Sequence, residues 1–409
     1  MQLLHSATRN YSWGSRSLIP HLQGQPDADK PVAELWFGAH PGDPSTVDGR
    51  LLNEVIAEDP AGQLGSRVSA EYGERLPFLL KVLAAEEPLS LQAHPSKAQA
   101  EEGFARENAA GIELTASNRN YKDDNHKPEL IVALTDFYAM AGFRPLARTR
   151  ELFAALECPE LDHYVAMLDD DPSATTESAN LRVLFTTWIT IPSAKRKELI
   201  SAIVAAGERL IAADPADWKS RVMSTVLDLN QRYPGDIGVL GALLLNHIEL
   251  SPGEAVYLDA GQLHAYVSGL GVEIMANSDN VLRGGLTPKF VDVPELVKVL
   301  TYAAADEPRV QQQDKSAQDN VHDAVAWSYP VPIEEFLLDR VELTGSSSMD
   351  LDYDGPTIAL CTAGSATFTD AAGKTLTATP GQAVWLPASE GLVTATAESD
   401  AADLFVARA

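Results

Sequence analysis

The sequence predicts a mainly β fold with an α-helical domain: two related β-barrels, the first of which is interrupted by a helical insertion. Three observations lead to this prediction. Short apolar runs of strand length recur in residues 1–145 and return from residue 247 onward. Residues 146–246 instead show the apolar spacing of helices. One turn-and-strand motif also occurs twice, and a chain of 409 residues is long enough for two or three domains.

Residues 1–145 are expected to form strands and turns with some helix, as the first part of a catalytic barrel. Short apolar runs lie at 78–84, 89–94 and 130–134. Their length, and the polar, proline or glycine residues between them, are typical of strands rather than helices.

Residues 146–246 are expected to form a helical domain, inserted into the β-rich part or packed beside it. Apolar residues recur three and four positions apart from Leu199 to Ile211, which places them on one face of a helix. Four further segments have helical character: 148–157, 181–189, 217–233 and 237–245.

Strand signals return after the helical segment, for example at 256–258 and 269–275. We therefore assign residues 247–320 to the second part of the catalytic barrel. A polar stretch, roughly 306–323, is expected to be a loop or linker. Residues 324–409 have strands and turns with almost no helical pattern, and we assign them to a non-catalytic barrel-like domain.

The repeated motif links the two barrels. Residues 252–260 read PGEAVYLDA and residues 380–388 read PGQAVWLPA, in each case a turn followed by a strand. Such a pair is typical of double-stranded β-helix (cupin) barrels. His264 follows the first copy, whereas the equivalent position after the second copy is Leu392. We therefore expect chemistry in the first barrel alone; the alternative is two unrelated Pro-Gly turns.

Charge and cysteine content exclude several classes of function. The formal net charge is −27, which repels nucleic acids and anionic membranes, so neither is an expected partner. Cys158 and Cys361 lie far apart and form neither a disulfide framework nor a cysteine-based zinc site. No apolar run approaches membrane-spanning length and the first residues lack a signal-like apolar stretch, so a cytoplasmic protein is expected.

Polar residues at regular spacing mark a candidate site. Ser90, Gln92 and His94 alternate with apolar residues and would share one face of a strand. Glu129 enters an otherwise apolar strand, where a carboxylate is costly unless it is paired or bound to a metal. His264 is placed at the expected mouth of the barrel.

Gln92, His94, Glu129 and His264 could together hold a divalent metal such as zinc, because imidazole and carboxylate are ordinary zinc ligands. Spacing alone does not separate this metal site from an ordinary polar core. Residues 273–289 add acids, amides and bases around a Gly-Gly turn. There Arg283 and Lys289 could supply a positive patch for an anionic ligand, and the alternative is a solvated loop.

Several segments resemble those of type I phosphomannose isomerases of the cupin superfamily. They are YSWG at 11–14, AELWFGAHP at 33–41, LSLQAHPS at 89–96, HKPEL at 126–130 and ANSDNVLRGGLTPK at 276–289. They occur in the order of that family across about residues 1–295. The resemblance implies an enzyme that interconverts mannose 6-phosphate and fructose 6-phosphate, which supplies mannose for nucleotide-sugar synthesis or for entry into glycolysis.

The resemblance also implies the residues that would act. One zinc ion per chain would be held by Gln92, His94, Glu129 and His264. The active-site arginine of the family falls on Arg283, and its neighbouring Asp and Lys fall on Asp279 and Lys289. The substrate would be a small sugar phosphate, and a monomer is expected.

The chemistry requires a proton to move between C1 and C2 through an enediol(ate). We assign Arg283 to the stabilisation of enediolate charge, and Ser90, Lys127 and Lys289 to the sugar or its phosphate. The proton-transfer base stays open between Lys127, Glu273, Asp279 and His94. A metal-dependent cupin oxygenase and a non-enzymatic sugar-binding cupin are the alternative functions.

Overall fold

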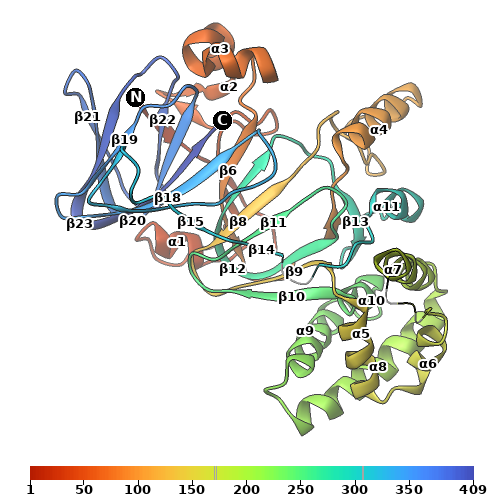
Figure 1. Ribbon diagram of the computed structural model, residues 1–409. Helices are drawn as coiled ribbons and strands as arrows, with labels where there is room; N and C mark the ends of the chain where they lie inside the picture. The colour runs from red at the N-terminus through yellow and green to blue at the C-terminus, as the bar shows by residue number, and fades with distance from the viewer. Residues whose placement is uncertain (170, 172, 306–307) are drawn as a thin grey trace.

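The computed structural model describes residues 1–169, 171, 173–305 and 308–409. The described fold is mostly β, with eleven helices, and its strands form an 11-stranded and a 12-stranded sheet. Figure 1 shows the blue strands of the C-terminal region at one end and a group of helices at the other, with the 11-stranded sheet between them. A mainly β fold with a helical part is therefore confirmed.

The predicted site residues lie in strands of the 11-stranded sheet or in the loops next to them. Its strands are β2 (Ala7–Arg9), β3 (Glu34–Phe37), β6 (Phe78–Ala85), β7 (Leu91–Ala93), β8 (Glu129–Ala133), β9 (Phe137–Phe143), β10 (Leu245–Leu250), β11 (Ala255–Leu258), β12 (His264–Ala276), β13 (Leu282–Gly285) and β14 (Arg309–Val310). The three apolar runs predicted as strands correspond to β6, β7 and β8. All eight residues of β6 are buried, which explains its nearly continuous apolar sequence.

The long strand β12 connects two groups of strands. Its first half pairs with β7 and β9, and its second half pairs with β6 and β8. The change of partner falls near Gly269, whose φ is +123°. A Cβ there would lie 2.7 Å from the carbonyl oxygen of Asp136, so only glycine fits this position. His264 is thereby held at the β7 end of the strand.

The 12-stranded sheet contains both ends of the chain. Its strands are β1 (Gln2–His5), β4 (Thr46–Val47), β5 (Arg50–Leu51), β15 (Gln313–Asp314), β16 (Val321–His322), β17 (Val325–Ser328), β18 (Leu337–Thr344), β19 (Ser348–Leu351), β20 (Thr357–Asp370), β21 (Thr375–Ala378), β22 (Ala383–Leu386) and β23 (Val393–Arg408). β1 pairs with β22 and β4, so β1, β4 and β5 belong to a sheet whose other strands all lie from residue 313 onward. The polar stretch expected as a loop or linker contains the short strands β14, β15 and β16 within its described part.

The helical region forms as its apolar spacing predicts. Its helices are α5 (Leu146–Leu156), α6 (Pro159–Val165), α7 (Ala174–Ile189), α8 (Ser193–Ala213), α9 (Trp218–Arg232) and α10 (Ile237–Ala242). The side chains of Ser173 and Asp217 cap α7 and α9 at their N-termini. One core joins this region to the sheet, where Phe143 of β9 packs on Phe185 of α7. The remaining helices are α1 (Leu18–Leu22), α2 (Leu52–Glu58), α3 (Pro60–Tyr72), α4 (Lys97–Ala109) and α11 (Val293–Val299).

The two copies of the repeated motif make the same hydrogen bonds. The amide of Gly253 donates to the carbonyl of Ala133 at 2.8 Å, and the amide of Gly381 donates to the carbonyl of Cys361 at 2.9 Å. Ala133 and Cys361 in turn donate to the residue after each glycine, both at 2.9 Å. In both copies, the strand after the turn pairs antiparallel with the strand that contains the accepting residue: β11 with β8, and β22 with β20. The repeat seen in the sequence is therefore also a repeat of backbone structure.

No helix in the described parts of the chain combines the length and the apolar character needed to cross a membrane.

Candidate metal and substrate site

Three neighbouring strands bring the predicted metal ligands together. In the register of β7, Gln92 lies opposite His264 of β12 on one side and opposite Arg283 of β13 on the other. His94 follows β7 directly, and Glu129 is the first residue of β8. The segments that carry these four residues are far apart in sequence, and the pairing of β12 with both β7 and β8 brings them close together.

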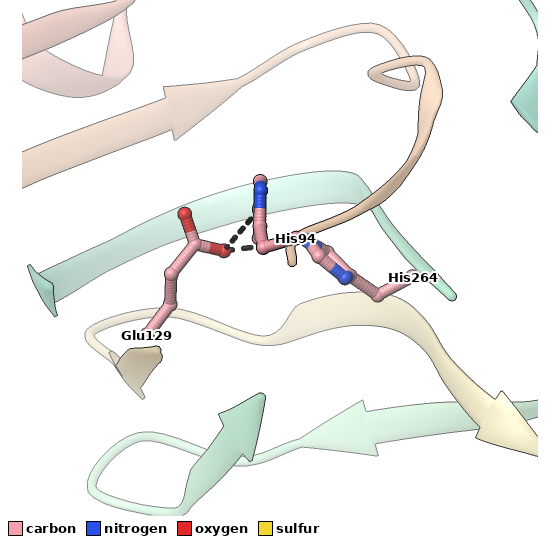
Figure 2. A group of neighbouring side chains, drawn as sticks. All are labelled: His94, Glu129 and His264. Atoms are coloured by element: carbon pink, nitrogen blue, oxygen red, sulfur yellow. Dashed lines mark ion pairs between the residues drawn. The ribbon is translucent and has the colours of Figure 1, made fainter. Parts of the chain in front are cut away.

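The side chains of His94, Glu129 and His264 form a buried cluster. Each offers one ligand atom, and these atoms lie within 4.8 Å of one another. Glu129 Oε2 is 3.4 Å from His94 Nε2 and 3.3 Å from His264 Nε2. Figure 2 shows the carboxylate pointing toward both rings. Two imidazoles and a carboxylate are ordinary zinc ligands, so this donor set fits zinc.

The orientation of the two rings supports a metal site. Nδ1 of His94 donates to the carbonyl of Asn280 at 2.7 Å, and Nδ1 of His264 donates to the carbonyl of Gln262 at 2.9 Å. A carbonyl can only accept, so each ring donates from Nδ1, and a neutral ring held in this way has its lone pair on Nε2. Nε2 of His94 is buried and has no hydrogen-bond partner among the described residues. A buried acceptor without a partner is costly, and a bound cation would satisfy it.

The surroundings of the cluster favour the protonation states in which histidine and glutamate bind metals. Burial and the charge of Lys127 lower the pKa of His94 to about 4, so its imidazole is neutral at neutral pH. Burial opposes ionisation of Glu129, but Lys127 at 2.7 Å and the neighbouring His94 and His264 hold the pKa of this carboxyl well below its usual range. The cluster therefore offers a neutral imidazole at His94 and an ionised carboxylate at Glu129.

A cavity of about 460 Å³ opens beside the cluster. Its walls include nine of the residues predicted for the site: Ser90, Gln92, Lys127, Glu129, His264, Glu273, Asp279, Arg283 and Lys289. The tenth, His94, belongs to the metal cluster itself. The volume lies within the range typical of small-molecule pockets.

Three cations face this cavity without a counter-charge. Lys122, Arg283 and Lys289 all line it, and in the described part of the chain none of the three side chains forms an ion pair. Burial lowers the pKa of Arg283, and burial together with Arg283 and Lys122 lowers the pKa of Lys289. In a protein of net charge −27, unpaired cations in one cavity favour an anionic ligand. Lys122 was not predicted from the sequence.

The two predicted acids differ in their surroundings. Glu273 is buried and held by two groups: Lys81 Nζ lies 2.8 Å from one carboxylate oxygen, and the hydroxyl of Tyr266 donates to the other at 2.8 Å. Burial raises the pKa of Glu273. Asp279 is exposed to the cavity, and its carboxylate lies 3.6 Å from Nε2 of His40.

Lys81 is a cavity residue that the sequence reasoning missed. It lies in the middle of β6, with 5% of its surface exposed, and also approaches the carboxylate of Glu34 at 3.8 Å. The signal was present in the sequence, because a lysine inside the apolar run FLLKVLA is as unexpected as Glu129 in its own strand. Trp36, whose indole donates to Glu34 at 2.9 Å, completes this buried network.

The fold and the site define a metal-binding β protein with a pocket for a small anionic molecule. Residues 1–146 match the family model described as phosphomannose isomerase type I, catalytic domain. The mannose-6-phosphate isomerase of Escherichia coli K12 is 36% identical over 402 residues, which cover 96% of each chain. The human enzyme is 35% identical over 84% of this chain and 82% of its own.

Solved structures indicate the same family. A mannose 6-phosphate isomerase bound with zinc and yttrium superposes with a TM-score of 0.87 at 34% identity, over 100% of this chain and 99% of that chain. The Salmonella typhimurium enzyme bound to fructose 6-phosphate and zinc gives the same TM-score and coverage at 33% identity. The chain belongs to the mannose-6-phosphate isomerase family.

Proposed function

We propose that this protein is a zinc-dependent isomerase that interconverts mannose 6-phosphate and fructose 6-phosphate. One observation carries the proposal: the buried His94–Glu129–His264 cluster borders the same cavity as the unpaired cations. The cluster suits one zinc ion, and the cations suit the phosphate of the substrate. Relatives that carry this enzyme's name across bacteria, fungi and human support the same function.

We assign one zinc ion to His94, Glu129 and His264, with Gln92 as the fourth ligand. Gln92 lines the cavity opposite His264 in the strand register, and a neutral ligand leaves the metal more Lewis-acidic. When bound, zinc can polarise the sugar carbonyl and hold the neighbouring hydroxyl.

The remaining residues bind and stabilise the substrate. Arg283, which has no carboxylate partner in the described structure, is placed to stabilise negative charge that develops on the enediolate oxygen. Ser90, Lys127 and Lys289 would contact the sugar or its phosphate, and Lys122 lies on the same cavity wall.

The proton between C1 and C2 needs a base beside the sugar. Glu273 already accepts from Lys81 and Tyr266, His94 is a ligand, and Lys127 is paired with Glu129. Asp279 also lines the cavity, but its carboxylate is exposed there and lies 3.6 Å from the nearest ring nitrogen, that of His40. We therefore favour Asp279 for this step.

The finer architecture is also a proposal. We infer two cupin-type barrels, because the two Pro-Gly turns make matching backbone hydrogen bonds. We assign residues 1–145 and 247–320 to the catalytic barrel, 146–246 to the helical domain and 324–409 to the C-terminal barrel. The strands β1, β4, β5, β15 and β16 complete the sheet of the C-terminal barrel. We further propose a cytoplasmic monomer.

Chelation tests the function directly. Conversion of mannose 6-phosphate to fructose 6-phosphate should disappear when the metal is removed and return when zinc is added back. The conversion should have the same rate in the absence of oxygen. Dependence on oxygen and iron would instead favour an oxygenase, and sugar binding without turnover would favour a non-enzymatic protein.

A further inference from the structure

Two loops beside the metal cluster are tied together by one buried side chain. Asn280, which is fully buried, accepts from the amides of Lys122 at 2.7 Å and Asp123 at 3.2 Å. Its amide nitrogen donates to the carbonyls of Asp123 at 2.9 Å and Asn125 at 2.8 Å. The side chain therefore uses its full hydrogen-bonding capacity on the segment 122–125.

The side chain of Asp123 links segments 122–125 and 278–280 a second time. One carboxylate oxygen accepts from the hydroxyl of Ser278 at 2.7 Å and from the amide nitrogen of Asn280 at 3.1 Å. The other accepts from the backbone amide of Asp279 at 2.7 Å. The residues Asp123, Ser278 and Asn280 thus form a polar knot in which each donor has a partner.

The knot is connected to two of the proposed metal ligands. The main-chain carbonyl of Asn280 accepts the Nδ1 proton of His94, which fixes both the tautomer and the ring direction. The segment 122–125 leads within four residues to Glu129. A shift of one loop against the other would therefore change the distance between the two ligands.

We propose that Asn280 is a positioning residue for the metal centre: its side-chain amide locks segment 122–125 against segment 278–280, and so fixes His94 relative to Glu129. Asn280 does not contact the cavity and takes no part in the chemistry. It acts through the His94 ring, which its own carbonyl orients, and through the segment that leads to Glu129. This inference rests on the proposed zinc-dependent function.

The variant Asn280→Asp tests the proposal with almost no change of shape. It replaces the two N–H donors by an oxygen that faces the carbonyls of Asp123 and Asn125 and the carboxylate of Asp123, so attraction becomes repulsion. Outer-shell changes of this kind weaken metal binding by roughly 10- to 100-fold. We expect a zinc dissociation constant at least tenfold higher than that of the wild type, measured by competition with a chelator, and an altered visible spectrum of the cobalt-substituted protein.

Asn180 provides a matched control in the helical region. It is buried, accepts from the amide of Asp169 at 3.0 Å and donates to the carbonyl of Asp169 at 2.8 Å, but has no metal ligand beside it. Asn180→Asp should lower the melting temperature while leaving the zinc dissociation constant within twofold of wild type. Equal loss of zinc affinity in both variants would mean that general destabilisation is responsible, and would overturn the proposal.

The outcomes separate the two proposals. If the wild-type protein binds zinc and isomerises the substrate but Asn280→Asp retains wild-type affinity, the positioning role is wrong and the function stands. If the wild type does not bind zinc, the proposed function is wrong, whatever the variants show. Should Asn280→Asp not fold, Asp123→Asn replaces one of the two accepting oxygens by a donor, which faces either the backbone N–H of Asp279 or the side-chain amide of Asn280. This variant should raise the dissociation constant at least threefold; an unchanged value there would overturn the positioning role.

Discussion

Replacing Lys81 by methionine should destabilise the protein by about 3–5 kcal/mol, the usual result of breaking a buried ion pair by removing one partner. Lys81 lies between two buried carboxylates, those of Glu273 at 2.8 Å and Glu34 at 3.8 Å. Methionine fills most of the space of the lysine stem but supplies no charge. Glu273 would keep only its hydrogen bond from Tyr266.

The magnitude follows from these distances. With an effective dielectric constant of about 20, the attraction is about 6 kcal/mol at 2.8 Å and about 4 kcal/mol at 3.8 Å. Dehydration of three buried charges offsets a large part of this gain, so the loss on mutation is smaller than the sum. Burial alone would lower the pKa of Lys81, but the carboxylates raise it, whereas burial raises the pKa of Glu273 despite Lys81. Attraction therefore outweighs dehydration at the lysine but not at this carboxyl.

The assay is urea unfolding of wild type, Lys81→Met and the double variant Lys81→Met with Glu273→Gln. The double variant should recover more than half of the lost stability, because it removes the uncompensated charge. Lys97→Met is a control: Lys97 is half exposed and lies 3.8 Å from Glu101, so its loss should cost less than about 1 kcal/mol. A cost below about 1 kcal/mol for Lys81→Met, or no recovery in the double variant, would refute the reasoning.

Two further predictions concern activity and pH. Arg283→Ala should lower kcat by at least about a hundredfold while the zinc content stays at wild-type level, because a charged donor to the developing oxyanion is lost; near-normal turnover would exclude this role. Burial and Arg144 lower the pKa of His247 to about 3, so below pH 6.5 the unfolded chain binds a proton that the folded protein does not, and stability falls as the pH drops toward 3. At pH 5 this costs about 1–2 kcal/mol for the half-buried ring. His247→Gln should therefore lose less stability than wild type between pH 7 and pH 5 in chemical unfolding; an equal loss in both proteins would contradict the prediction.

The helices and most strands could be predicted from local pattern alone. The 15 residues of α9 follow an aspartate that caps them, and their apolar residues recur at helical spacing, so everything needed lies within one segment. The strand pairing could not be predicted in this way. Gln2 pairs with Trp385, and no feature of residues 1–10 indicates that partner.

The site was predictable to the extent that its residues violate the local pattern. Glu129 stood out because it begins an otherwise apolar strand. Lys81 interrupts an apolar strand as well, but its role depends on its ion pair with Glu273. Glu273 is 192 positions away and reaches Lys81 only through the pairing of β6 with β12. The polar knot around Asn280 is hidden for the same reason, since Asp123 and Asn280 look like ordinary loop residues until the two loops meet.

The second copy of the repeat has the same strand pairing as the first but lacks its ionisable residues. Glu129 lies opposite Leu258 at the end of the first Pro-Gly strand, and Thr357 lies opposite Leu386 at the same place in the second. Thr357 is as buried as Glu129 but carries no charge. The same strand geometry therefore does not require a carboxylate at this position.

The comparison extends to the other buried acid. Glu273 pairs with Ile131 on β8, and the corresponding pairing on β20 joins Val406 with Ala359. Val406 is fully buried in an apolar core, whereas Glu273 needs Lys81 to offset the cost of burying its charge. Two copies of one backbone motif thus differ at the positions where the first carries ionisable groups, and a buried ionisable residue is stable there because it has a partner. The charges in the first copy are costly to the fold, which is why their positions indicate function more directly than the shared architecture does.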